Sequence, residues 1–284
     1  VSIFNFDTFT TAIYQAWYSF FSIETAKQLA SIMIVIVFGL LLIEQYSRKR
    51  KRFTQLGKAQ QEIRIQLRGW KAALATSYCC LILLMAFVLP VGQLAVWAYQ
   101  TWGSMFDTNL WSYALHSLVI SLLAALFVML AALGLALSKR FIPSNQSIWL
   151  TKIATLGYGI PGTILAVGIF LPVAWLDNAL IDLFGLSENS MGWIKGTLGV
   201  LILAYAVRFM AIAFSAIESG LERISPQQEE AARSLGKQGI SLVISIHLPL
   251  LKGALSVAML MVFVDVMKEM PIMLMIRPFG WDTL

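Results

Sequence analysis

Apolar residues recur along this chain in runs much longer than a buried strand needs, separated by shorter polar segments. A helix that crosses the hydrocarbon core of a membrane, about 30 Å thick, requires about 20 mostly apolar residues. Six runs come close to that length or exceed it, so the sequence predicts an all-α, polytopic membrane protein. The six predicted spans are Leu29–Ile43, Ala72–Ala98, Ser117–Leu137, Ile153–Trp175, Trp193–Ala216 and Leu251–Met267.

The composition indicates the same class of protein. Apolar residues make up 58% of the 284 positions, charged residues only 13%, and the mean hydropathy is +0.76. A soluble domain of this size does not need so much apolar surface to build its core. The chain starts without Met, a basic segment or a small-residue cleavage site, so we predict no signal peptide and expect the first residue to be a cut within a longer protein.

The net charge of +6 is distributed in a way that predicts membrane orientation. Most of the 21 Lys and Arg residues lie in alternate loops, within residues 48–71, 139–152 and 223–252, and the loops Tyr99–Tyr113 and Asp177–Asn189 contain none. Cytoplasmic loops carry an excess of Lys and Arg, so the basic loops are predicted to be cytoplasmic and both chain ends to lie outside. The run RKRKR is interpreted as a signal for this topology, and no nucleic-acid partner is predicted.

The last basic loop contains a short segment with the signals of a helix start and a helix end. Ser225 suits the N-cap, Pro226 the first helical position, and Gln228 completes a capping box. Gly236 can adopt the left-handed conformation that ends a helix. We therefore predict a helix from about Pro226 to Leu235.

This predicted helix has two different sides. Ala231 and Ala232 lie next to Leu235 and give an exposed face of small apolar groups, which suits the groove of another protein. Glu229 is placed to pair with Arg233, four residues later, along the other side. A helix resting on lipid headgroups is the alternative, but the segment has no Trp or Phe to anchor it.

The same loop resembles the EAA loop of transmembrane subunits of type I ABC importers. The pattern Glu-Ala-Ala, three residues, Gly, nine residues, Ile-x-Leu-Pro matches that loop at every fixed position. The resemblance implies a coupling helix that docks into a cleft of an ATP-hydrolysing subunit, with Gly236 as a hinge, and it assigns no role to His247. The implied coupling residues are Glu230, Ala231, Ala232, Leu235, Gly236, Ile246, Leu248 and Pro249.

A narrower resemblance covers most of the chain after Lys71. The segments GYGIPGTILAVG, AYAVRFMAIAFSAIESGLERISP and MKEMPIMLMIRPFGWDTL are similar to the second half of fused, two-half permeases for ferric iron. Relatives for thiamine, sulfate, polyamines or phosphonates are alternatives. The resemblance divides the chain into an outer segment and last helix of a preceding half (1–46), a basic cytoplasmic linker (47–71) and a second permease half (72–284), with the coupling loop at 217–250. The final helix of that half is expected to be missing, and the similar segments FNFDTF and FGWDTL fit an internal repeat.

The resemblance also implies partners and a location. A permease of this kind lies in the bacterial inner membrane and works with a cytoplasmic ABC ATPase dimer, a periplasmic substrate-binding protein and the preceding permease half. The sequence contains no Walker A segment ending in Gly-Lys-Ser/Thr, so ATP and Mg²⁺ are expected on the ATPase and no cofactor on this chain. No catalytic residues and no metal site are predicted, and the chain is not expected to be an enzyme.

Four charged residues lie within or at the edge of predicted spans. Arg208 is inside the fifth span, and Asp265, Lys268 and Glu269 are spaced to share one helical face. Charges at membrane depth cost about 2.5 kcal/mol or more each unless they are paired or hydrated. These residues are therefore candidates for a translocation pathway or gate, or for ion pairs that hold helices in register. A secondary transporter or channel with a charge relay is the alternative function from another class.

Overall fold

The computed structural model describes residues 8–49, 67–105, 108–184, 194–278, 280, 281 and 283. Every regular element in these ranges is a helix, and six helical segments are long and apolar enough to cross a membrane. The predicted all-α polytopic architecture is therefore confirmed. The six segments are Ile23–Leu40, Trp70–Thr101, Leu110–Phe141, Gly162–Leu183, Leu198–Leu221 and Gly239–Met267.

The chain divides into two compact units, which are described separately here. One unit is Ser47–Ser112, and the other combines Val1–Tyr46 with Tyr113–Leu284. The first contains α3 (Trp70–Leu83), a π-helical turn η2 (Leu84–Val88) and α4 (Leu89–Met105). Because Pro90 lacks an N–H group, the helix before it widens into the π turn. The predicted division at residues 46 and 71 is not tested by this arrangement and stays a prediction.

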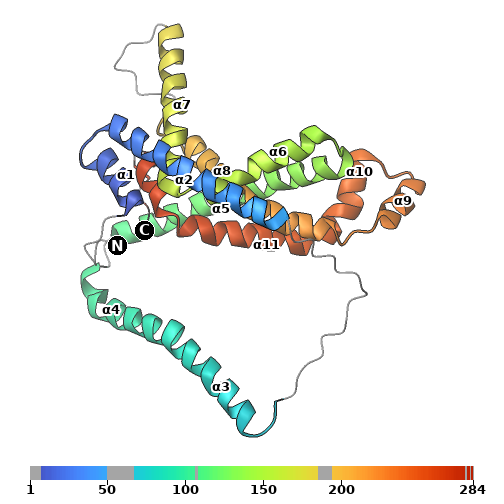
Figure 1. Ribbon diagram of the computed structural model, residues 1–284, viewed down its shortest axis with the longest axis horizontal. Helices are drawn as coiled ribbons and strands as arrows, with labels where there is room; N and C mark the ends of the chain where they lie inside the picture. The colour runs from blue at the N-terminus through green and yellow to red at the C-terminus, as the bar shows by residue number, and fades with distance from the viewer. Residues whose placement is uncertain are drawn as a thin grey trace. The chain divides into compact units, whose positions relative to one another are not determined.

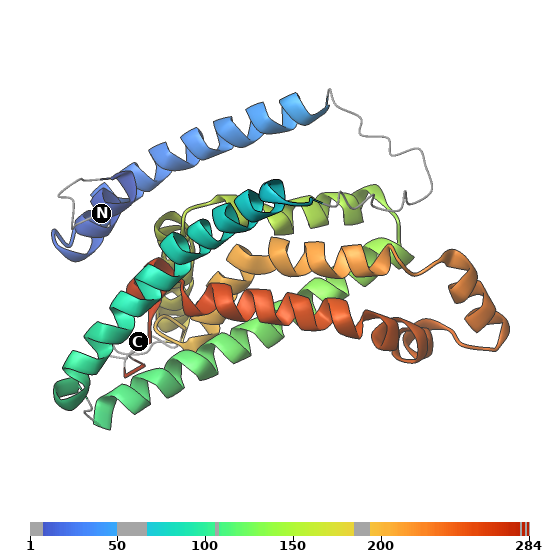
Figure 2. The same ribbon diagram turned by 90° about the horizontal axis from the view of Figure 1, so that it is seen from below.

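The larger unit is a helical bundle around α8 (Leu198–Leu221), which packs along α11 (Leu248–Met267) (Figure 1). The remaining elements of this unit are α1 (Phe9–Tyr18), α2 (Ile23–Lys49), α5 (Thr108–Phe141), α6 (Asn145–Thr155), η3 (Leu156–Gly159), α7 (Gly162–Leu183), α9 (Pro226–Ser234), α10 (Gly239–Leu242), η4 (Val243–His247) and α12 (Met270–Ile276). The short helix α9 lies at one end of the bundle and α1 at the other (Figure 2).

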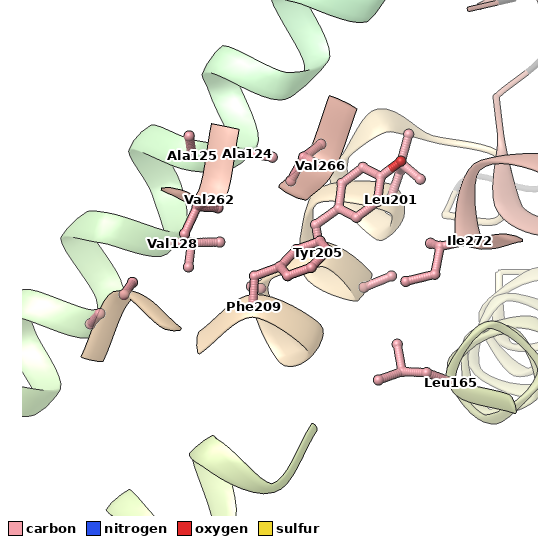
Figure 3. Close-up of a cluster of buried hydrophobic side chains, with 14 of the residues drawn as sticks. Ala124, Ala125, Val128, Leu165, Leu201, Tyr205, Phe209, Val262, Val266 and Ile272 are labelled. Carbon is pink, nitrogen blue, oxygen red and sulfur yellow. The ribbon is translucent and has the colours of Figure 1, made fainter. Parts of the chain in front are cut away.

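Apolar side chains from several helices form the core of the bundle. Tyr205 and Phe209 of α8 face Val128 of α5 and Val262 of α11, while side chains of α7 and α12 close the other side (Figure 3). Small residues let the helices approach closely, since a Cβ added at Gly220 of α8 would lie 2.6 Å from the Cβ of Ala254. Association inside a membrane depends on such close packing.

The predicted span Ile153–Trp175 is wrong, because this segment is two helices rather than one. The chain passes from α6 through the 3₁₀ turn η3 to an extended residue, Ile160, and α7 begins only after Pro161. A residue before proline is kept out of the helical region, and proline itself cannot donate a backbone hydrogen bond. The glycines of this segment fit the expectation of close packing, because a Cβ on Gly157 would collide with the backbone carbonyl of Val207 in α8.

We expect Gly157→Ala to lower the free energy of unfolding by about 1–3 kcal/mol, because the new methyl group would push η3 away from α8. Gly134→Ala is the matched control, since no atom lies within 4 Å of a Cβ at this exposed position of α5. Alanine there should change stability by no more than about 1 kcal/mol, in the stabilising direction. Denaturation of both variants of the full-length protein in detergent checks this, and equal stability of the two variants would contradict it.

Candidate functional site

The loop helix α9 begins and ends where the sequence predicts. The backbone N–H of Ser225 donates to Oε1 of Gln228 at 3.1 Å, which is half of the predicted capping box. The helix continues from Pro226 to Ser234, and Gly236 then adopts a left-handed conformation with φ of +81°. A side chain at this position would be strained, so the glycine fixes the point at which the chain turns back toward the membrane.

The exposed face of α9 differs from the predicted one by one residue. Glu230 and Ala231 are exposed, and Leu235, just after the helix, has 82% of its surface accessible. Ala232, however, is buried against the bundle with 4% exposure. The prediction that Ala232 belongs to the exposed face is therefore wrong, and its small size serves close packing of α9 instead.

The last three residues of the predicted coupling set belong to the return into the membrane. Ile246 lies in the π turn η4, and Leu248 and Pro249 begin α11. Ile246 and Leu248 are half-buried, and Leu248 packs against the core. These residues are placed to connect the loop with the membrane-spanning helix rather than to form the face of α9.

Glu229 pairs with Arg140 and His247, so its predicted pairing with Arg233 is wrong. Nη2 of Arg140 and Nε2 of His247 lie 2.9 and 3.0 Å from the same carboxylate oxygen of Glu229. The His247 ring is fully buried, and the Glu229 side chain is 12% exposed. Partners from α5 and η4 thus reach α9 from the side that faces the bundle.

The electrostatics of this cluster favour an ionised Glu229. Burial by itself would raise the pKa of the Glu229 carboxyl, but the hydrogen bond with His247 and the charge of Arg140 outweigh burial and lower this pKa below its ordinary value. An ionised carboxylate only accepts hydrogen bonds, so Nε2 of His247 carries the hydrogen. The cluster therefore stabilises the fold above the ordinary Glu pKa, and this contribution is lost as the pH falls through the lowered pKa.

A second charged cluster lies in the middle of the bundle. Nε of Arg208, on α8, donates to Oε2 of Glu269 at 3.1 Å, and its Nη1 donates to the carbonyl oxygen of Ile160. Ile160 precedes α7 and Glu269 precedes α12, so each lies at an interruption between two helices. The side chains of Arg208 and Glu269 are 18% and 10% exposed, and their ion pair compensates two charges at membrane depth.

Asp265, Lys268 and Glu269 do not share one helical face. Helix α11 ends at Met267, and the chain turns at Lys268 and Glu269 before α12. Asp265 pairs with the largely exposed Lys268 at 2.5 Å, whereas Glu269 points to Arg208. The expected ion pairs are therefore present, but they form two separate pairs, because the helix ends between their members.

A small cavity adjoins Glu269. It has a volume of about 120 Å³ and is lined by polar groups of α5, α8 and the segment after α11, together with Ile120, Val266, Met267, Met270, Met273 and Leu274. The polar lining residues are Ser117, Ser121, Tyr205, Glu269, Arg277 and Thr283. Polar groups around a cavity inside an apolar bundle are expected where water or a transported solute contacts the protein.

Residues 132–281 match the protein family described as "Binding-protein-dependent transport system inner membrane component". This segment extends from Ala132 within α5 to Trp281 and includes both charged clusters. The chain belongs to this family. It is accordingly a multi-pass protein of the inner membrane and part of a transport permease, and its described residues include six helical segments long and apolar enough to cross a membrane.

Curated relatives of this permease carry different solutes. The whole chain is 25% identical to 54% of the Fe(3+)-transport system permease protein FbpB 2 of Haemophilus influenzae. About 61% of the chain is 31% identical to 60% of the putative 2-aminoethylphosphonate transport system permease protein PhnV of Salmonella typhimurium. The thiamine transport system permease protein ThiP of Escherichia coli is 25% identical over 89% of the chain and 45% of its own length. The chain thus spans about half the length of the longer relatives it matches.

Sequence reasoning missed Arg140 and His247 as members of the cluster around Glu229. Arg140 is 89 positions from Glu229 along the chain, and helical spacing reveals only partners three or four residues apart. One signal was available for His247, because a polar residue in the apolar stretch SLVISIHLPLL needs a buried partner. That signal does not identify the partner.

We expect Glu269→Ala to lower the free energy of unfolding by about 3–5 kcal/mol, because it leaves Arg208 charged and unpaired in the bundle. The double variant Arg208→Met, Glu269→Met should recover much of this loss, since it removes both charges. Asp265→Ala is the control, and it should have little effect because Lys268 is exposed to solvent. Denaturation in detergent measures all three, and equal losses in Glu269→Ala and Asp265→Ala would contradict the assignment.

Proposed function

We propose that this chain is part of the transmembrane subunit of an ATP-driven, binding-protein-dependent importer and that α9 docks on a cytoplasmic ATPase. One observation carries the proposal: α9 is a capped helix at the predicted cytoplasmic end of the bundle, with Glu230, Ala231 and Leu235 exposed on its surface. Exposed Leu235 is an apolar side chain that fits an apolar cleft of a partner. ATP and Mg²⁺ are then bound by the ATPase dimer, and this chain does no hydrolysis itself.

A periplasmic binding protein and a second permease half complete the proposed assembly. The family description refers to binding-protein-dependent transport, which supports delivery of the solute at the outer face. The iron and thiamine relatives are about twice as long as this chain, which supports a second half of similar size. ATP binding would close the ATPase dimer, and α9 would pass this movement to the membrane helices as a change between outward and inward access.

Ferric iron is the solute we propose. The match that covers the whole chain is to an Fe(3+)-transport permease, and this supports iron over the alternatives. Relatives named for 2-aminoethylphosphonate and thiamine keep those two solutes as competing candidates. Sulfate and polyamines are weaker candidates, because they rest on the sequence resemblance alone.

We also propose that the Arg208–Glu269 pair is part of a gate. It joins α8 to two interrupted helices beside a polar cavity, which is the arrangement that a movable contact requires. Asp265 and Lys268 lie next to it and are candidates for the same pathway. The double methionine variant separates a gate from a merely structural pair, because a gate predicts that uptake fails even where folding recovers.

Glu230→Lys and Gly236→Pro should abolish uptake while the permease remains inserted in the membrane. The first places the opposite charge on the docking face, and the second cannot adopt the φ of +81° that ends α9. Glu222→Lys is the matched control, because Glu222 is exposed in the same loop but lies before α9. Copurification of the ATPase and uptake into cells measure the effect, and normal uptake by both variants would contradict α9 as the docking helix.

ATP hydrolysis by the reconstituted full-length complex should be stimulated by its binding protein when that protein is loaded with ferric iron. Thiamine, 2-aminoethylphosphonate, sulfate and a polyamine, each with the same binding protein, serve as the comparison. Stimulation by one of these solutes and not by iron would contradict the proposed substrate but retain the proposed importer. A complex that hydrolyses no ATP with any of them would contradict the importer.

A further inference from the structure

One side chain at the end of α5 contacts three separate parts of the cytoplasmic region. Nε and Nη2 of Arg140 lie 3.0 and 2.9 Å from Oε1 of Glu229 on α9. Nη1 donates to the carbonyl oxygen of Leu221 at 3.1 Å, and Nη2 donates to that of Ile224 at 2.8 Å. Arg140 therefore joins α5 to the end of α8, to the linker after it and to α9.

Both carbonyl groups belong to buried residues at or just after the end of α8, since Leu221 and Ile224 are each 4% exposed. The Leu221 carbonyl also accepts from the backbone N–H of Ile224 at 3.1 Å, whereas the Ile224 carbonyl accepts from Arg140. A guanidinium group presents five N–H donors in a rigid plane and can bond several acceptors at once. The ammonium group of lysine has the same charge but cannot hold this geometry.

Glu229 has a second partner in the same cluster. Nε2 of His247 lies 3.0 Å from its carboxylate, and the His247 ring packs edge-on against Phe141, the neighbour of Arg140. Because His247 directly precedes α11, one carboxylate of α9 is fixed to the ends of α5 and α11 together. A displacement of α9 must either break this cluster or move those helices with it.

We propose that Arg140 is a positioning residue that transmits movement of α9 to α5 and α8. This inference rests on the proposed function, in which an ATPase moves α9. Arg140 acts through Glu229 and does not belong to the docking face, because Glu230, Ala231 and Leu235 are exposed while Glu229 faces the bundle. Docking of the ATPase and transmission of its movement are thus assigned to different residues of one short helix.

The neighbouring residue provides a matched control. Lys139 has the same charge and lies on the same helix, but its partner is Glu218 of α8 and it makes no recorded bond to α9. We expect Arg140→Lys and Arg140→Gln to keep the copurified ATPase at the wild-type amount. The solute transported per ATP hydrolysed should fall by about tenfold, because the bonds of one charged group are lost. Lys139→Gln should keep the wild-type ratio.

A distance measurement tests the positioning directly and needs no ATPase. Spin labels at Gln227 on α9 and Gln146 on α6, both exposed, report how firmly α9 is held to the bundle. The full-length permease would carry serine in place of its native cysteines, Cys79 and Cys80 among them. Electron-electron double resonance should give a narrow distance distribution in the wild type and in Lys139→Gln, and a broad one in Arg140→Lys.

The inference would be overturned if Arg140→Lys kept the wild-type ratio of solute transported per ATP hydrolysed and also gave a narrow distance distribution. An equal loss of coupling in Lys139→Gln would also overturn it, because the effect would then follow from the charge of α5 rather than from the bonds to α9. If the wild-type complex retains no ATPase, the proposed function fails, and the distance distributions alone then decide whether Arg140 positions α9.

Discussion

Hydrocarbon offers no hydrogen bonds, so every charge and every interrupted helix within the membrane must find its partner inside the protein. Helix α8 meets this requirement for the larger unit through Arg208. The break before α7 frees the carbonyl of Ile160, the end of α11 places Glu269 at membrane depth, and the same guanidinium group bonds both. The two helix interruptions are stable at this depth because the continuous helix α8 places Arg208 between them.

The cluster around Glu229 uses the same chemistry at the end of α8. Arg140 also binds one carboxylate from a distant segment, Glu229, together with the backbone carbonyls of Leu221 and Ile224. In both clusters the arginine comes from a long helix and its partners come from short or interrupted elements. The long helices thus determine where the short helices α9 and α12 are attached.

Much of this organisation could be predicted from local sequence signals. Apolar run length predicts the spans, and Ser225, Gln228 and Gly236 mark both ends of α9, because capping depends on neighbouring residues only. The break at Pro161 falls inside one predicted span, because hydropathy does not distinguish one continuous apolar helix from two helices. The side of α9 that Ala232 occupies depends on tertiary packing, and so do the partners of Glu229. Contacts between residues that lie far apart along the chain cannot be identified from a single sequence.

The two clusters are connected by one continuous stretch of helix. Arg208 lies in the middle of α8 and Leu221 at its end, about 20 Å apart at a rise of about 1.5 Å per residue. Helix α8 has buried side chains along its length and packs closely against Ala254 and, through Val207, against Gly157. Such a helix resists bending, so a shift of one end also displaces the other end. Coupling of this kind requires an element with two discrete arrangements. The Arg208–Glu269 pair is the candidate for such an element, because this ion pair can be formed or broken. Arg140 must instead remain bonded to its partners in both arrangements, so that the movement reaches the Arg208–Glu269 pair.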